Sequence, residues 1–166
     1  MRLGVLLTPG FLEDEAALSL EVARRKGWEG VTFARHRASL EGAAGSVWVP
    51  RYSLAARPEL DLLVIPGSLR MSRQAQDPLL RGWLDEEIGR LQAIFLGANA
   101  AVLLSSYLQS PLSAAPQAQE VLQNLGFALS EAPWLWQGSF CTTQGHLALL
   151  RALMAWAGLG AEPGLS

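Results

Sequence analysis

A short apolar segment followed at once by glycine constrains the fold of this chain more than any other feature. Residues Ala93–Leu96 are all apolar, which is typical of a buried strand, and Gly97 begins an alanine-rich run that is typical of a helix. A strand that turns sharply into a helix places the turn residue at the end of a sheet, facing the N–H groups of the helix. Many enzymes hold a nucleophile on such a turn, with glycine two residues later. By this spacing the turn residue is Phe95, which has no nucleophilic group.

Length and composition indicate a single α/β domain. The chain has 166 residues, of which 50% are hydrophobic and 17% are charged, and this balance fits one core around a well-buried sheet. The formal net charge of −2 argues against a nucleic-acid surface, and no apolar segment is long enough to cross a membrane. We therefore expect a soluble, cytoplasmic protein. All basic residues except Lys26 are arginine, a bias typical of GC-rich and of some thermophilic genomes.

The only cysteine is Cys141, so an internal disulfide is excluded. Two histidines accompany it, His36 and His146, which are too few for a structural zinc site of the usual Cys/His type. We expect neither a metal nor a cofactor.

The order of predicted elements favours a parallel sheet covered by helices on both faces. Buried strands are predicted at 3–8, 31–34, 60–65 and 93–96, and weaker strands at 127–129, 134–136 and 139–142. Helices are predicted at 13–26, from Asp77-Pro78 onward, and at 118–125 and 145–157, with a small antiparallel excursion at 39–50. The expected fold is a flavodoxin-like three-layer α/β sandwich with a mostly parallel central sheet. It forms one domain over residues 1–160, with a frayed tail at 161–166.

Four segments, in this order, resemble the ThiJ/PfpI superfamily, whose fold is class I glutamine amidotransferase-like. The first is the opening strand with its Pro9-Gly10 turn and the acid-bearing helix that ends at Gly27. The second joins 42–50 to the strand and turn at 60–67. The third is 93–98, which resembles the nucleophile elbow, and the fourth is 142–145. The resemblance implies the predicted fold, with a pocket at the carboxyl ends of the central strands.

The departures from this resemblance concern the catalytic residues. The superfamily usually has cysteine at the elbow, where this chain has Phe95, and its catalytic histidine falls in a region, 110–116, that contains none here. Ser68 replaces the second glycine of the strand-end turn, whereas the acid at the head of the first helix is retained as Glu15. Cysteine catalysis needs an activated thiolate, so the resemblance does not imply that chemistry here.

The resemblance places eight residues around the pocket: Glu15, Gly67, Ser68, Phe95, Leu96, Thr143, Gln144 and His146. Glu15 is either the pocket acid or one of three acids that favour a helix N-terminus. Phe95 either plugs the site or belongs to the core, and Ser68 is either an oxyanion donor or a turn residue. His146 is either a displaced base or a satisfied residue in the first turn of a helix. Cys141 is either a relocated nucleophile or a buried core residue.

The function expected first is a catalytically degenerate ThiJ/PfpI-like protein that binds a small molecule or serves as a dimeric interaction module. A homodimer is implied by the superfamily and by the six tryptophans, which are common at interfaces. The alternative is a hydrolase or lyase of the amidase/peptidase-like class that uses Glu15 with His146 or Cys141 in a rearranged site. A purely structural subunit would have Phe95 and Leu96 filling the pocket.

Burial beside Phe95 and Leu96 would raise the pKa of the Glu15 carboxyl. On that interpretation, Glu15→Gln should be neutral or stabilising at neutral pH.

Overall fold

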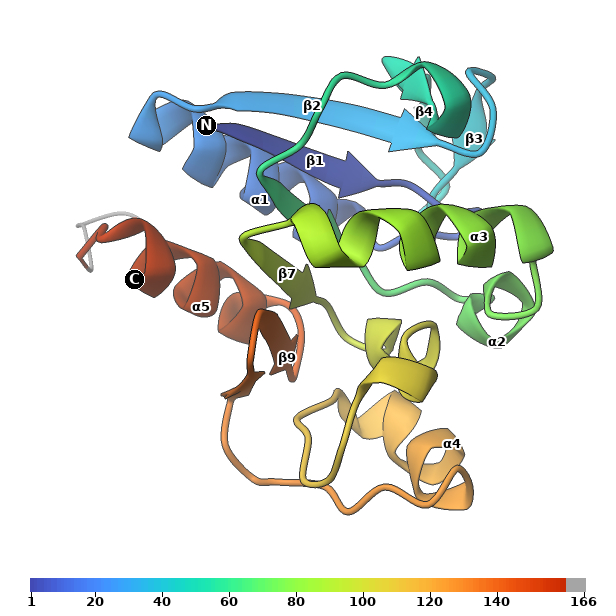
Figure 1. The fold of residues 1–166 in the computed structure, drawn as a ribbon, viewed down its shortest axis with the longest axis vertical. Coiled ribbons are helices and arrows are strands. Elements are labelled where there is room, and N and C mark those ends of the chain that lie inside the picture. Colours follow the sequence, from blue (N-terminus) through green and yellow to red (C-terminus); the bar gives the residue numbers. More distant parts are fainter. Residues whose placement is uncertain (161–166) are drawn as a thin grey trace.

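The computed structural model describes residues 1–160 and contains a seven-stranded sheet with the order β5-β2-β1-β6-β7-β9-β8 (Figure 1). All neighbouring strands are parallel except β8, which pairs with β9 in the antiparallel direction. The predicted mostly parallel sheet is therefore confirmed. The strands are β1 (Arg2–Leu6), β2 (Glu29–Ala34), β5 (Tyr52–Ser53), β6 (Leu62–Ile65), β7 (Ala93–Leu96), β8 (Trp134–Gln137) and β9 (Phe140–Thr143).

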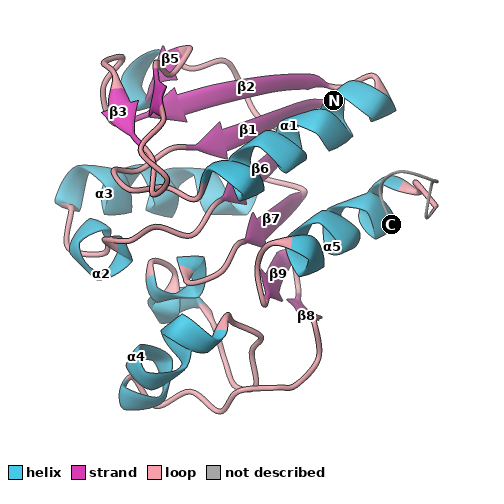
Figure 2. Cartoon of the chain, turned by 180° about the vertical axis from the view of Figure 1, so that it is seen from behind, coloured by secondary structure: helices cyan, strands magenta, loops and turns pink. Residues whose placement is uncertain are grey.

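Helices cover both faces of this sheet, as the three-layer prediction requires. Helices α1 (Glu13–Lys26) and α5 (Leu147–Ala157) pack side by side on one face, which is turned to the viewer in Figure 2. Helix α3 (Pro78–Glu87) lies on the other face, together with the short helices α2 (Met71–Gln74) and α4 (Gln119–Asn124). No helix within residues 1–160 is long and apolar enough to cross a bilayer. The predicted tail at 161–166 lies outside the described residues.

Capping signals set the helix bounds. Helix α1 begins and ends where the sequence predicts, with acids in its first turn and bases in its last, matching the helix dipole. Gly27 ends it in the left-handed conformation with φ of 75°, which glycine adopts without a steric penalty. Helix α3 begins after Asp77, whose carboxylate accepts a hydrogen bond from the Leu79 N–H at 3.0 Å.

The predicted antiparallel excursion is a separate two-stranded ribbon of β3 (Leu40–Glu41) and β4 (Val47–Trp48). Glu13 of α1 anchors its turn, accepting hydrogen bonds from the Ala44 N–H at 2.9 Å and the Ser46 hydroxyl at 2.7 Å. Burial acts to raise the pKa of Glu13, but these hydrogen bonds outweigh it, and the pKa is lowered. The ribbon is thus tied to the start of α1.

The chain after Gly97 differs from its prediction. The alanine-rich run forms two 3₁₀ turns at Ala100–Val102 and Ser105–Tyr107, not a regular helix. Tertiary contacts outweigh helix propensity here, because the Ala98 carbonyl accepts a hydrogen bond from the distant Ala115 N–H at 2.9 Å. Of the predicted strand at 127–129, only an isolated bridge from Leu129 to Leu112 forms. Strand β5 and helix α2 were not predicted.

Phe95 belongs to the core on the α1–α5 face of the sheet. It is fully buried and contacts two tryptophan rings edge-on, with centroids 5.4 Å away for Trp136 and 6.2 Å for Trp156. Leu96 points to the opposite face, because successive side chains of a strand alternate. The two residues therefore belong to the cores on opposite faces of the sheet.

Phe95→Ala should lower the free energy of unfolding by about 3–5 kcal/mol, because it removes a buried ring from a packed aromatic cluster. Chemical denaturation followed by far-UV circular dichroism measures this loss. Phe127→Ala is the matched control, since Phe127 is only partly buried at the edge of the other core, and its loss should be clearly smaller. Equal losses for the two variants would contradict the core position of Phe95.

Candidate functional site

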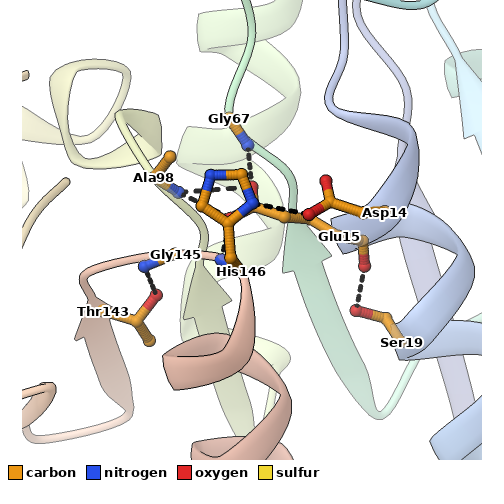
Figure 3. A network of polar contacts seen from close by, with 8 residues as sticks. All are labelled: Asp14, Glu15, Ser19, Gly67, Ala98, Thr143, Gly145 and His146. Carbon is orange, nitrogen blue, oxygen red and sulfur yellow. Dashed lines mark hydrogen bonds and ion pairs between the residues drawn. The ribbon is translucent and has the colours of Figure 1, made fainter. Parts of the chain in front are cut away.

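The carboxylate of Glu15 joins helix α1 to the ends of three strands (Figure 3). Its Oε1 accepts a hydrogen bond from the Gly67 N–H, after β6, at 2.7 Å. Its Oε2 accepts one from the His146 N–H, after β9, at 2.6 Å. The Ala98 N–H, after β7, lies 3.2 Å from Oε1 and 3.1 Å from Oε2. Both oxygens are therefore occupied by backbone donors.

Glu15 has no exposed surface, although it carries an ionisable group. Burial raises the pKa of the Glu15 carboxyl, while hydrogen bonds from the Gly67, His146 and Ala98 N–H groups act to lower it. The direction agrees with the expectation from the sequence. The backbone turns after β6, β7 and β9 contribute to this burial, in addition to the apolar side chains that the sequence suggested.

Gly97 faces Glu15 across the turn after β7. A Cβ built on Gly97 would collide with Oε1 of Glu15 and lie 2.9 Å from the Gly67 nitrogen. A Cβ on Gly145, where φ is 82°, would lie 2.6 Å from Oε2. The Glu15 carboxylate thus occupies the space that side chains at 97 and 145 would need. Phe95 is a residue of β7, and the turn that faces Glu15 begins two residues later, at Gly97.

Ser68 has no backbone N–H to offer to a ligand. Its N–H donates to Oδ1 of Asn99 at 2.8 Å, and its carbonyl accepts from the Asn99 side-chain amide at 2.7 Å. Its hydroxyl donates to the Pro9 carbonyl at 2.7 Å. Asn99 therefore joins the turn after β6 to the turn after β7. The oxyanion-donor alternative for Ser68 does not fit this geometry, and the turn alternative does.

Thr143 and Gln144 shape the turn after β9. The buried Thr143 hydroxyl donates to the Leu96 carbonyl at 2.7 Å and accepts from the Gly145 N–H at 3.0 Å. The Gln144 side chain instead points to the Glu131 carbonyl, at 3.2 Å. The Thr143 hydroxyl thus joins the end of β7 to Gly145, the residue before the His146 N–H that binds Glu15. The Gln144 side chain makes no such link.

His146 has the only positive φ among the non-glycine residues of the described chain, at 50° with ψ of −120°. Such a conformation is strained for a residue with a side chain. The imidazole is about half exposed, and its Nδ1 lies 2.5 Å from Oδ2 of Asp14. The Asp14 carboxylate raises the pKa of His146. His146 therefore reaches Glu15 through its backbone N–H and Asp14 through its ring, and Asp14 was not among the predicted site residues.

Neither family models nor curated sequences match this chain, but solved structures do. A two-domain protein of Anabaena variabilis, with DJ-1/ThiJ/PfpI-like and ferritin-like domains, matches with a TM-score of 0.83 at 15% identity, over 99% of this chain and 50% of that one. A cysteine-to-alanine mutant of a DJ-1 superfamily protein from Salmonella typhimurium gives 0.81 at 20%, over 95% and 88%. DJ-1beta of Drosophila melanogaster gives 0.81 at 21%, over 94% and 88%.

The chain has the DJ-1/ThiJ/PfpI fold. It spans half the length of the Anabaena protein and most of the length of the other two. The resemblance in four sequence segments and the match in structure therefore agree on the architecture.

Cys141 is remote from solvent within this DJ-1/ThiJ/PfpI fold. It lies in β9, opposite Phe95 in the parallel pairing, and is fully buried. Burial raises the pKa of its thiol to about 12, so the reactive thiolate is scarce at neutral pH. This favours the structural alternative for Cys141. Among residues 1–160, no group of three His, Cys, Asp or Glu side chains is arranged to hold a metal ion.

Glu15→Gln should lower the free energy of unfolding by about 1–3 kcal/mol at neutral pH. The substitution replaces one carboxylate oxygen by an NH₂ group, which donates hydrogen bonds and cannot accept them. The N–H groups of Gly67, Ala98 and His146 all need an acceptor at this place. The expectation from the sequence, a neutral or stabilising change, is thereby revised. Chemical denaturation measures the loss, and Glu86→Gln on the exposed face of α3 is the control, which should change little.

The same variant should also change the pH dependence of stability. Because the folded pKa of Glu15 is raised, its favourable contribution is complete below the unfolded pKa and is lost as pH rises through the folded pKa. Glu15→Gln removes that decline. The difference in the free energy of unfolding between wild type and variant should therefore shrink as pH rises from the unfolded pKa to the folded pKa of Glu15. A difference that grows with pH would contradict the raised pKa.

Proposed function

We propose that this protein is a catalytically degenerate relative of the DJ-1/ThiJ/PfpI proteins that acts by binding a small molecule. The observation that carries the proposal is the buried Glu15 carboxylate, with both oxygens held by backbone N–H groups. A catalytic acid or base must come within hydrogen-bond distance of the substrate proton that it transfers. Glu15 has no exposed surface through which a substrate could approach it.

The residues around Glu15 support the same proposal. Gly97, which faces the acid, has no side chain, and the only thiol of the chain is buried in β9 with a raised pKa. Covalent catalysis of the superfamily's kind needs a nucleophile beside an activating group. The site has kept the acid and lacks the nucleophile.

Catalytic assays test this proposal. We expect no turnover of a chromogenic peptide amide, a chromogenic ester or methylglyoxal above the rate in buffer. Cys141→Ala and Glu15→Gln should leave these rates unchanged. Turnover by the wild-type protein that either variant abolishes would contradict the proposal.

A second candidate function, hydrolase or lyase activity, is favoured by one observation. The Asp14–His146 pair has the form of a carboxylate that orients a histidine base, and the imidazole is about half exposed. The same assays separate the two candidates. Turnover that His146→Gln abolishes and His36→Gln does not would support the enzyme, and its absence would support the binding protein.

We also propose that the protein forms a homodimer, supported by apolar side chains left on its surface. Val47, Val49 and Leu69 are 66%, 67% and 71% exposed, and Leu69 lies near the β3–β4 ribbon, since both border a hollow that also contains Gly10. Apolar groups gathered on a surface are typical of interaction sites.

Size-exclusion chromatography with light scattering should give twice the chain mass at micromolar concentration. The double variant Val47→Asp and Val49→Asp should reduce the mass to that of one chain, because it places charge in the proposed interface. Leu125→Asp, on an apolar side chain 52% exposed after α4, should leave the dimer intact. A wild-type mass of one chain would exclude the homodimer.

A further inference from the structure

A cavity of about 360 Å³ lies at the carboxyl ends of β1 and β2, apart from the Glu15 network. Its walls come from the segment after β1, the loop after β2, the end of α2 and the start of α3. None of the residues that bind the Glu15 carboxylate lines it. We call it the β1–β2 pocket. Its volume falls within the range of small-ligand sites, about 300–1,000 Å³.

The position of this pocket follows from the order of the strands. From β1 the chain proceeds through α1 to β2 on one side, whereas β6 leads through α3 to β7 on the other (Figure 1). Open parallel sheets bind ligands outside the carboxyl ends of their strands, where such connections diverge. The β1–β2 pocket lies at the carboxyl end of β1, one of the two neighbouring strands, β1 and β6, from which the chain proceeds in opposite directions along the sheet.

The interior of the pocket is mostly apolar and suits a compact hydrophobic group. Side chains of Leu6, Ala34, Ala38, Leu40 and Leu80 contribute to its walls. Thr8 adds one polar group, because its hydroxyl is buried and has no hydrogen-bond partner within residues 1–160. Buried hydroxyls are normally paired. The Thr8 hydroxyl has almost no exposed surface, so the apolar walls decide which ligand body the pocket accepts.

The charged residues of the pocket leave an excess of one positive charge. Arg35 pairs with Asp77 at 3.2 Å, and this ion pair joins the loop after β2 to the start of α3. Arg73 is exposed on α2 and forms no ion pair with any described residue. A guanidinium binds a carboxylate through two parallel hydrogen bonds. The Asp77 carboxylate, which lies among these cations, disfavours a doubly charged phosphate.

We propose that the β1–β2 pocket binds a small organic monocarboxylate, with its apolar body among the leucine and alanine side chains and its carboxylate at Arg73. The pocket then supplies the ligand site that the closed Glu15 network does not. This inference deepens the proposed function, since it names the class of small molecule and the place where it binds.

The test uses 3-phenylpropanoate as the probe and compares it with 3-phenylpropan-1-ol, which has the same body without the charge. Binding to the whole chain is followed by ¹H–¹⁵N correlation spectra and by calorimetry. We expect shifts at the amides of Thr8, Arg35 and Ala38, and a Kd for the acid at least about fivefold lower than for the alcohol. Shifts centred on Gly67, Ala98 and His146 would overturn the proposal, as would no binding at about 10 mM probe.

Three variants locate the contacts. Arg73→Gln should raise the Kd of the acid about fivefold and leave that of the alcohol nearly unchanged. Ala38→Trp should abolish binding of both, because it fills the pocket from an exposed position that folding does not require. Arg70→Gln is the matched control, since Arg70 is an exposed arginine just before α2 that does not line the pocket, and its Kd should stay within about twofold.

An unchanged Kd in Arg73→Gln, or an equal rise in Arg70→Gln, would overturn the proposed carboxylate contact. These outcomes are distinguishable from failure of the proposed function. Binding of the acid concerns the β1–β2 pocket, whereas turnover in the catalytic assays concerns the Glu15 network or the Asp14–His146 pair.

Discussion

The structure depends on one buried carboxylate. Glu15 extends from the first turn of α1 and accepts hydrogen bonds from the turns after β6, β7 and β9. Without it, three backbone N–H groups at the end of the sheet would lack partners, and buried donors without partners are costly. A negative charge without these donors would be equally unfavourable in the same place. The acid and the turns therefore require each other, and together they join the start of α1 to the carboxyl ends of β6, β7 and β9.

Three consecutive acids at the head of α1 have three different partners. Glu13 holds the β3–β4 ribbon, Asp14 pairs with the ring of His146, and Glu15 holds the strand ends. Successive residues of a helix project about 100° apart, so neighbouring side chains reach different parts of the molecule. The start of α1 is thus an organising point for the β3–β4 ribbon, helix α5 and the strand turns. In the sequence, these acids are indistinguishable from residues that merely match a helix dipole.

Sequence patterns predicted the architecture well where local signals are strong. The bounds of α1 follow from charges and a terminal glycine, and those of β7 from an uninterrupted apolar run. The turn residue was assigned to Phe95 because Gly97 lies two residues later, whereas Phe95 is a residue of β7 and the turn begins at Gly97. The roles of Asp14 and Asn99 were missed because they depend on contacts with His146 and Ser68, which are distant in the sequence. The β1–β2 pocket joins three separate segments and has no signature in any one of them.

The collision between a side chain at Gly97 and the Glu15 carboxylate also bears on how this protein can evolve. A nucleophile introduced at position 97 alone would displace the acid from its three donors, and removing the acid alone would leave those donors unpaired. Each single change is costly, so the two positions can change only together or through an unstable intermediate. The introduction of a side chain at position 97 is therefore opposed by epistasis between positions 15 and 97.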